Sequence, residues 1–258
     1  MISKSLQFPK GFRWQDWVER WDKMQERYIV RRSERIELLI HLVGAARSPV
    51  RHVLDLGCGT GSLMQPFLDA YPDAEVYGID FDPVLLPLAQ ERLRSYGTRT
   101  KIILADLRSD DWRAQCPSAV DAVISATALH WLTEKQLSDL YRRLSNVIGP
   151  EGLFVNADHV ASGTPEIQKF WEQRREQRLR FEANQEGDDW DGFWVEYLKA
   201  LGLSGLLQAN ERVLGGWEGG IEKGLPLEWH FSELTASGFS HPECFWRCGC
   251  DAIYGAFR

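Results

Sequence analysis

Hydrophobic and polar positions change their period along the chain, and each period predicts a kind of element. From Trp14 to Tyr28 the large apolar side chains recur every three or four residues with charged residues opposite them, which predicts an amphipathic helix with an aromatic face. A second helix is predicted through Ile36 and Val43, ending near Gly44. The aromatic face of the first helix must cover another part of the molecule.

From residue 53 onward, short apolar runs alternate with helical patterns. Strands are predicted at 53–56, 75–80, 101–105, 120–126 and 152–157. Helices are predicted after the first strand and at 83–96 and 134–148. This alternation predicts an α/β fold with an open, mostly parallel sheet and helices on both of its faces.

Residues 163–225 break the alternation. A charged helix at 166–181, a second helix at 193–201 and a glycine-rich stretch at 215–220 predict a helical insertion, and alternating segments at 243–248 and 252–257 predict a closing hairpin. We therefore expect an N-terminal helical cover at 1–48, a Rossmann-like core at 49–162, an insertion at 163–228, and a final helix with the hairpin at 229–258.

Composition and charge narrow the class of protein. The chain has 258 residues, of which 44% are hydrophobic and 26% charged. It contains no run of about 18 apolar residues, so we expect no membrane insertion. A net charge of −7 makes nucleic acid an unfavourable partner. The N-terminal segment lacks the apolar core of a secretory signal and the five cysteines lack paired spacing, so we expect a cytoplasmic protein without a metal site.

The strongest chemical signal is a glycine loop that directly follows the first predicted strand. Gly57, Gly59 and Gly61 stand at alternate positions after Asp55, with Cys58 among them. The missing side chains let the backbone approach a ligand closely, and the strand before and helix after the loop are the context of a nucleotide-binding fold.

Two acidic residues end the next two predicted strands. Asp80 can accept hydrogen bonds from both hydroxyls of a ribose; it could instead cap the following helix, a role for which Asp82 is better placed. Asp106 can accept a hydrogen bond from an adenine amino group, and Leu107 can pack on the ring. The carboxyl ends of parallel strands meet at one edge of a sheet, so these residues are expected to share one crevice.

Together these motifs resemble the class I S-adenosylmethionine-dependent methyltransferases. The resemblance rests on VLDLGCGTGSL, on the acid in VYGIDFDP, on ADL after the third strand and on SATALHWL after the fourth. The chain is also similar to the trans-aconitate methyltransferase-like group in its aromatic helix, in Leu-His-Trp-Leu at 129–132 and in Asn-Ala-Asp-His at 156–159. We do not carry over the substrate of that group. The glycine spacing also differs from the G-x-G-x-x-G of dinucleotide dehydrogenases.

The resemblance implies a Rossmann-like sheet of seven strands, the last antiparallel, with S-adenosylmethionine across the carboxyl ends of the first four. It implies that Asp55 orients the amino-acid end of the cofactor and that the backbone around Ser125 and Ala126 contacts its ammonium group. Closure of the N-terminal helix would bring Tyr28 and Arg32 to the cofactor. The expected cofactor-binding set is Asp55, Gly57, Cys58, Gly59, Gly61, Asp80, Phe81, Asp106, Leu107, Ser125, Ala126, Tyr28 and Arg32.

Methyl transfer is a displacement at a carbon activated by a sulfonium, so the protein must align the nucleophile and exclude water. A hydroxyl or ammonium nucleophile also needs a base, whereas a carboxylate or thiolate does not. His130 and His159 come at or just after the fourth and fifth strands and are candidate bases. Each could equally be a hydrogen-bonded loop histidine.

The insertion and the tryptophans are candidates for binding the acceptor. Helical spacing places Arg174 and Arg178 in the middle of an apolar face of the helix at 166–181, where they could grip a carboxylate. A structural ion pair or snorkelling at the edge of that face is the alternative. Trp21 and Trp131 are expected to line the same acceptor site.

We therefore expect an enzyme that methylates a small molecule beneath a lid made of the aromatic helix and the insertion, as a monomer or homodimer. A tRNA- or RNA-modifying methyltransferase, an enzyme that uses carboxy-S-adenosylmethionine, and a non-catalytic S-adenosylmethionine-binding protein remain alternatives. An NAD-linked oxidoreductase is disfavoured because its glycine pattern is missing. The acceptor and the methylated atom do not follow from the sequence.

Overall fold

The computed structural model describes residues 8–183, 188–206 and 223–258, so the predicted glycine-rich stretch at 215–220 lies outside the described residues. The strands are β1 (His52–Leu56), β2 (Glu75–Asp80), β3 (Thr100–Leu104), β4 (Val120–Ala126), β5 (Ile148–His159), β6 (Ser240–Cys248) and β7 (Asp251–Phe257). The α-helices are α1 (Trp14–Tyr28), α2 (Arg32–Ala46), α3 (Met64–Ala70), α4 (Leu86–Arg92), α5 (Glu134–Leu144), α6 (Pro165–Ala183), α7 (Trp190–Ala200) and α9 (Leu227–Ala236).

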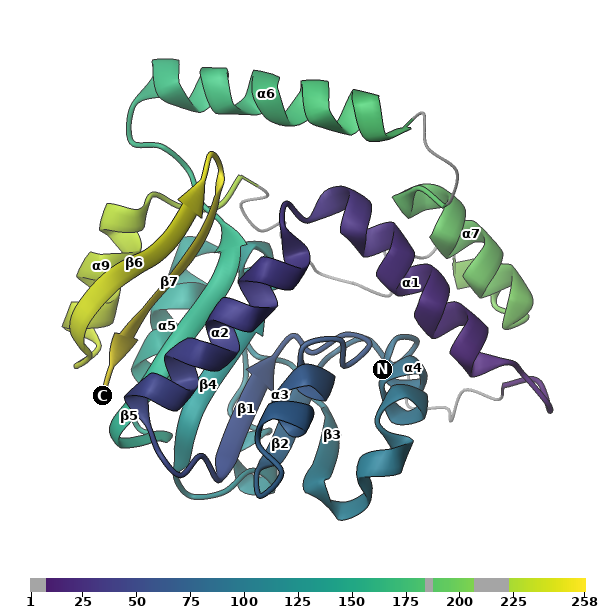
Figure 1. Ribbon diagram of the computed structural model, residues 1–258, viewed down its shortest axis with the longest axis horizontal. Coiled ribbons are helices and arrows are strands. Elements are labelled where there is room, and N and C mark those ends of the chain that lie inside the picture. Colours follow the sequence, from purple (N-terminus) through teal and green to yellow (C-terminus); the bar gives the residue numbers. More distant parts are fainter. Residues whose placement is uncertain (1–7, 184–187, 207–222) are drawn as a thin grey trace.

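All seven strands form one sheet in the order β3-β2-β1-β4-β5-β7-β6 (Figure 1). The pairs from β3 to β5 are parallel, and β7 is antiparallel to both of its neighbours. The predicted α/β class and the seven-stranded sheet with an antiparallel last strand are confirmed. The order reverses between β1 and β4, the switch point beside which open α/β sheets bind ligands.

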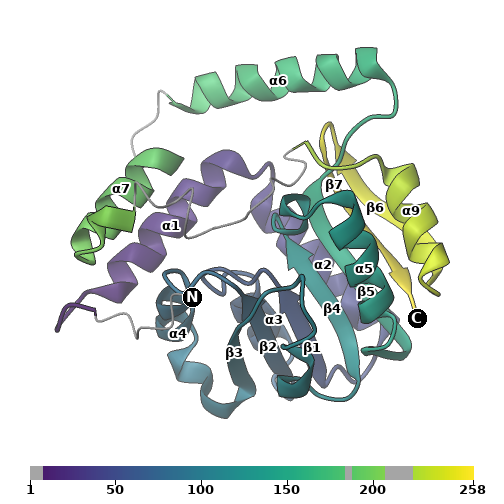
Figure 2. The ribbon, with the colours of Figure 1, turned by 180° about the vertical axis from the view of Figure 1, so that it is seen from behind.

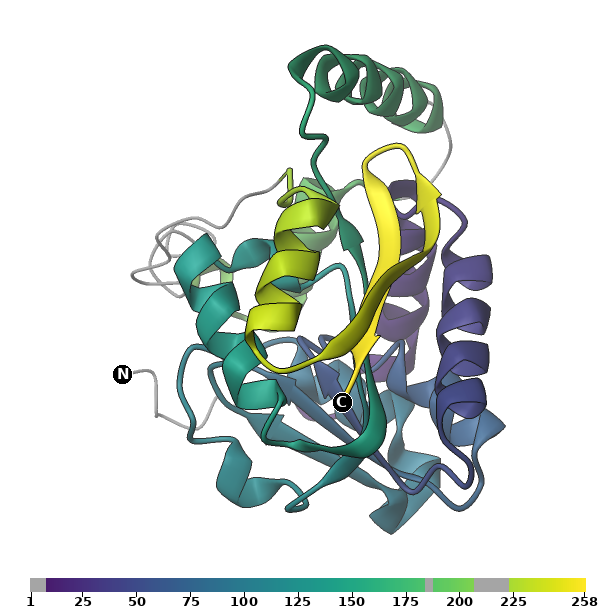
Figure 3. The same cartoon turned by 90° about the vertical axis from the view of Figure 1, so that its left-hand side faces the viewer.

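Helices cover both faces of the sheet, which explains why its central strands β1 and β4 are buried along most of their length (Figure 3). On one face, α5 and α9 bury their apolar sides against the sheet; Leu140, Tyr141 and Leu234 are fully buried there. On the other face, α2, α3 and α4 pack with residues such as Leu39 and Phe67. The helices on the two faces leave the carboxyl ends of the parallel strands uncovered at one edge of the sheet.

A third cluster joins the aromatic face of α1 to α7 and α4 (Figures 1 and 2). Trp17 contacts Tyr197 with ring centroids 5.1 Å apart, and Trp21 contacts Phe193 at 5.3 Å. The Tyr197 hydroxyl donates a hydrogen bond to the Val84 carbonyl at 2.9 Å, just before α4. The predicted aromatic helix is therefore held over the start of α4 by the insertion.

Helix α6 extends above the rest of the molecule from the β6–β7 turn to the end of α1 (Figure 1). Its first anchor is Trp171, whose ring lies against Gly249, since a Cβ there would be 3.1 Å from the ring. Its second anchor is Arg178, which donates hydrogen bonds to the carbonyls of Arg27 and Tyr28 at 3.0 and 3.1 Å.

Several predicted boundaries were wrong. The helix predicted at 83–96 is split into α4 and a 3-10 segment (Arg94–Arg99) that contains Gly97 at a φ of 57°. The helix predicted at 134–148 ends at Leu144, because β5 already begins at Ile148 and is longer than the predicted 152–157. Among the described helices, none combines the length and apolar character needed to cross a membrane.

Candidate functional site

The glycine loop leaves the carboxyl end of β1 and is tied to the end of β2. The N–H groups of Gly57 and Cys58 both donate to the Ile79 carbonyl, at 2.8 and 3.0 Å. Asp80 then accepts from the Gly59 N–H at 2.8 Å and from the Asp82 N–H at 2.9 Å, one bond to each carboxylate oxygen. Asp80 therefore shapes the loop, and each of its oxygens keeps a lone pair for a ligand.

Glycine is required at the start of the loop for two reasons. Gly57 has a φ of 68°, and a Cβ on it would lie 2.4 Å from the Cβ of Ala128, on the segment after β4. The glycine loop and the segment after β4 therefore meet with only the Ala128 methyl group between them. This brings the predicted cofactor side and the predicted acceptor side of the edge into direct contact.

Asp55 lies below the loop and is 1% exposed. Its Oδ2 is buried and has no hydrogen-bond partner among the described residues. Burial, with a contribution from the charge of Asp80, raises the pKa of Asp55 to about 8. A buried carboxyl without a cation is the feature expected where a positively charged ligand group completes the site.

Five other predicted cofactor residues lie along the same edge, and the two with polar side chains, Asp106 and Ser125, already have hydrogen-bond partners. Asp106 is paired with Arg108, whose Nε lies 2.8 Å from Oδ2. Burial would raise the pKa of Asp106, but the hydrogen bonds from Arg108 and its charge lower it. Leu107 and Ala126 are half-buried and Phe81 is 37% exposed. The Ser125 hydroxyl donates to the Leu56 carbonyl at 2.7 Å, which joins β4 to β1.

Tyr28 and Arg32 lie where α1 meets α2, and both side chains hold helices together. The Tyr28 hydroxyl accepts from the Trp190 N–H at 2.9 Å, and Arg32 pairs with Asp22 at 3.2 Å. Sequence reasoning missed a link from α1 to the glycine loop. Arg92 pairs with Asp22 at 2.8 Å and donates from Nε to the Thr60 carbonyl at 2.9 Å. The cover helix is thereby coupled to the loop.

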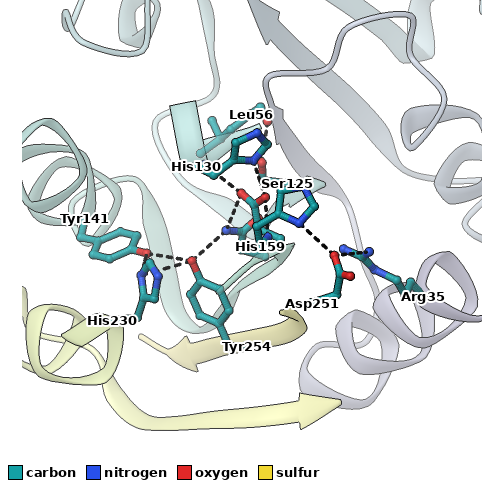
Figure 4. Close-up of polar contacts among 11 residues, drawn as sticks. Arg35, Leu56, Ser125, His130, Tyr141, His159, His230, Asp251 and Tyr254 are labelled. Carbon is teal, nitrogen blue, oxygen red and sulfur yellow. Dashed lines mark hydrogen bonds and ion pairs between the residues drawn. The ribbon is translucent and has the colours of Figure 1, made fainter. Parts of the chain in front are cut away.

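The two predicted histidines lie side by side on the acceptor side, and each is paired with a buried aspartate (Figure 4). The ring centroids of His130 and His159 are 4.8 Å apart. His130 Nδ1 lies 2.6 Å from Asp158 Oδ1, and His159 Nδ1 lies 3.0 Å from Asp251 Oδ1. When Nδ1 donates to a carboxylate, Nε2 is the nitrogen that can accept a proton.

Asp158 is fully buried and holds both the ring and the backbone of His130. Its Oδ2 accepts from the His130 N–H at 3.0 Å, and its Oδ1 accepts from the His159 N–H at 2.8 Å. Burial alone would raise the pKa of Asp158, but the charge and hydrogen bond of His130 and the contribution of His159 hold it well below its usual value. Asp158 therefore stays ionised beside the imidazole.

Asp251 joins the second histidine to the N-terminal cover. Its Oδ1 lies 3.4 Å from a guanidinium nitrogen of Arg35 on α2, and both side chains are buried. Burial would raise the pKa of Asp251, but the hydrogen bond and charge of His159, followed by the charges of Arg35 and Arg175, lower it. No sequence pattern linked these residues, although the Asp158-His159 pair at a strand end was a local signal.

A small cavity of about 10 Å³ lies under the histidines, with Asp158, His230 and Tyr254 in its wall. Its volume fits roughly one water molecule, so it is not the acceptor pocket. Within the described part of the chain, no group of three or more His, Cys, Asp or Glu side chains is arranged to hold a metal ion.

The structure separates the residues that were predicted to bind the acceptor. Trp131 is 43% exposed next to His130, whereas Trp21 is buried between α1 and α7. Arg174 is exposed beside Phe170, and Arg178 binds the end of α1. Neither arginine therefore lies in a buried apolar face.

The predicted inner face of α6 was wrong by roughly a quarter turn at 100° per residue. Ile167, Phe170 and Phe181 are 46%, 48% and 73% exposed, because the anchors at Trp171 and Arg178 turn a different face inward. Arg175, between those anchors, is half-buried on the inner face, and its charge acts on Asp251. Arg175 is thus the α6 arginine whose charge reaches Asp251, the partner of His159.

Comparison with known proteins agrees with this geometry. Residues 53–152 match the family model described as a methyltransferase domain. A trans-aconitate 2-methyltransferase of Mycobacterium tuberculosis is 35% identical over 112 residues, which are 43% of this chain and 38% of that protein. A malonyl-[acyl-carrier protein] O-methyltransferase of Halorhodospira halophila is 29% identical over 154 residues, 58% of this chain and 50% of that protein. The matches span half or less of these relatives.

Solved structures share the fold over most of the chain. An O-methyltransferase family protein from Burkholderia thailandensis aligns with a TM-score of 0.56 at 14% identity, over 86% of this chain and 55% of that one. Human N-acetylserotonin methyltransferase aligns with a TM-score of 0.52 at 16% identity, over 95% and 57%. With its glycine loop, its strand order and the matched domain, the chain carries a class I S-adenosylmethionine-dependent methyltransferase domain.

Proposed function

We propose that this chain transfers a methyl group from S-adenosylmethionine to a hydroxyl or amine of a small-molecule acceptor, with His130 as the base. The observation that carries the proposal is the 2.6 Å contact between His130 Nδ1 and a buried, ionised Asp158, at the same sheet edge as the glycine loop. A carboxylate acceptor would need no base. The names of two relatives refer to acids, trans-aconitate and malonyl, so the acceptor class is the part that experiment must decide.

The residues present fit the cofactor. Asp55 offers an uncompensated carboxyl to its cationic end, Asp80 offers two acceptor oxygens to a ribose, and the backbone of the loop from Gly57 to Gly61 is open to close approach. When bound, S-adenosylmethionine would supply a methyl group activated by a sulfonium, and the rest of the cofactor would leave as a neutral thioether.

The remaining chemistry belongs to the chain. His130 Nε2 would take the proton of the acceptor hydroxyl or amine while Asp158 stabilises the imidazolium and fixes the ring. The proton is then released to solvent. Helices α1, α6 and α7 would form the lid that excludes water, with α1 coupled to the glycine loop through Asp22 and Arg92.

Calorimetric binding of S-adenosylmethionine, S-adenosylhomocysteine and NAD tests the cofactor. The two adenosyl ligands should bind and NAD should not. Asp80→Ala should weaken binding about 30- to 150-fold, because losing a charged acceptor of two N–H groups and of the ligand costs roughly 2–3 kcal/mol. Asp69→Ala, on α3 away from the loop, is the matched control and should bind as the wild type does. If neither adenosyl ligand binds the folded wild type, the proposal fails.

Cofactor binding should release a proton from Asp55. With the pKa of Asp55 at about 8, the carboxyl is protonated at pH 7 in the free protein and must ionise to meet a cation. Affinity should therefore rise with pH up to about 8, and titrations in two buffers of different ionisation enthalpy should show about one proton released at pH 7. Asp55→Asn should abolish this release. Proton uptake, or none exchanged in the wild type, would contradict the account.

His130→Gln should lower kcat for a hydroxyl acceptor by about 10²- to 10⁴-fold, the usual contribution of a general base, and should leave cofactor affinity unchanged. The measurement is the rate of S-adenosylhomocysteine formation with matched panels of phenols, amines and carboxylic acids. His41→Gln, an exposed histidine of α2, is the control. Methylation of carboxylic acids alone, at the same rate in His130→Gln, would refute the base and the acceptor class while leaving the cofactor assignment intact.

A further inference from the structure

We propose that a buried network of side chains, made of His230, Tyr141, Tyr254 and Asn156, positions Asp158 and through it His130. These are positioning residues, since no contact with the reacting atoms is assigned to them. The inference rests on the proposed function in that His130 is the base. Three of these residues, His230, Tyr141 and Tyr254, lie outside the segments that carry the resemblance to methyltransferases.

The chain of contacts is continuous in the structure (Figure 4). The Tyr141 hydroxyl lies 2.9 Å from His230 Nδ1, and the two tyrosine hydroxyls lie 3.3 Å apart. Asn156 Nδ2 donates to the Tyr254 hydroxyl at 2.9 Å and to Asp158 Oδ2 at 3.4 Å. Four elements contribute: α9, α5, β7 and β5.

The protonation states of these side chains limit which of them donate and which accept hydrogen bonds. Burial lowers the pKa of His230 to about 4, so its ring is neutral at physiological pH. Burial also raises the pKa of both Tyr141 and Tyr254, so each hydroxyl keeps its proton. In the tautomer that leaves His230 Nδ1 without a proton, Nδ1 is an acceptor for the tyrosine hydroxyls, at 2.9 Å from Tyr141 and 3.2 Å from Tyr254. With the Tyr254 proton directed there, the Tyr254 oxygen accepts from the Asn156 amide.

This pattern of donors and acceptors determines how Asn156 meets Asp158. Asn156 and Asp158 lie two residues apart on β5 and therefore on the same face of the sheet. With the amide nitrogen of Asn156 held by Tyr254, it is an N–H and not the carbonyl that is turned toward the Asp158 carboxylate. A flipped amide would place its oxygen against the carboxylate. The tyrosine therefore secures the orientation in which Asn156 supports the charge.

Packing alone does not account for these groups. All four side chains are buried, and His230 Nε2 and Asn156 Oδ1 have no hydrogen-bond partner among the described residues. Apolar side chains of similar size would avoid this cost, because incompletely satisfied buried networks are less stable than an apolar core. The chain of contacts ends at the one carboxylate that holds the candidate base, and this is where we infer its role.

Tyr254→Phe tests the inference, because it removes the hydroxyl that holds Asn156 and keeps the ring. Tyr197→Phe is the matched control: it removes an equally buried tyrosine hydroxyl that bonds only to the Val84 carbonyl, outside this chain of contacts. In the full-length protein, proton NMR should show the short His130–Asp158 hydrogen bond as a low-field Nδ1–H resonance. That resonance should be lost or broadened in Tyr254→Phe and unchanged in Tyr197→Phe.

The kinetic readout is separate. Tyr254→Phe should lower kcat by about tenfold to a hundredfold, the cost of a misplacement near 1 Å. The KM for S-adenosylmethionine should not change. Tyr141→Phe, which affects only the outer part of the chain, should give a smaller effect in the same direction.

Two results would overturn the inference. One is an unchanged Nδ1–H resonance in a folded Tyr254→Phe protein; the other is an equal change in Tyr197→Phe, which would indicate a general loss of packing. Because the resonance is observed without acceptor or turnover, failure of the proposed function would appear separately, as absence of cofactor binding or of methyl transfer in the wild type.

Discussion

A buried carboxylate must be compensated, and four of them lie along the carboxyl edge of this sheet. Asp80 is compensated by two backbone N–H groups, Asp158 by bonds from His130, His159 and Asn156, and Asp251 by His159 and Arg35. Asp55 alone among them keeps a buried carboxylate oxygen, Oδ2, without a hydrogen-bond partner among the described residues. The arrangement of the edge follows from how each of these charges is satisfied.

This constraint divides the edge into two halves. Over β1 and β2 the loop is shaped by backbone groups, and the remaining carboxyl is left for a cationic ligand. Beyond β4 the carboxylates are paired with imidazoles, which is an arrangement for moving a proton. The close approach of Gly57 to Ala128 joins the halves, so that a methyl group above the loop would lie beside the histidines. Helices on one face of the sheet contact both halves: Arg92 of α4 donates to the Thr60 carbonyl of the loop, and Arg35 of α2 pairs with Asp251.

The cofactor half could be predicted from the sequence because its determinants are local. A strand, alternate glycines and an acid at the next strand end lie within thirty residues, and parallel pairing fixes their relative positions. The acceptor half could not be predicted from the sequence, because its ion pairs join residues that are far apart in the chain. His159 and Asp251 are 92 residues apart, and Arg35 and Asp251 are 216 apart. The inner face of α6 was mispredicted for a similar reason: two tertiary anchors, and not its own apolar pattern, set its rotation.

We infer that the missing partner of Asp55 is the cationic amino-acid end of the cofactor. The most direct test compares the affinity of S-adenosylhomocysteine with that of 5′-methylthioadenosine, which lacks the amino acid, in the wild type and in Asp55→Asn. The account predicts that the wild type strongly prefers S-adenosylhomocysteine and that Asp55→Asn removes most of this preference by weakening that ligand alone. An equal preference in both proteins would show that Asp55 is compensated by something other than the cofactor, and would contradict the account.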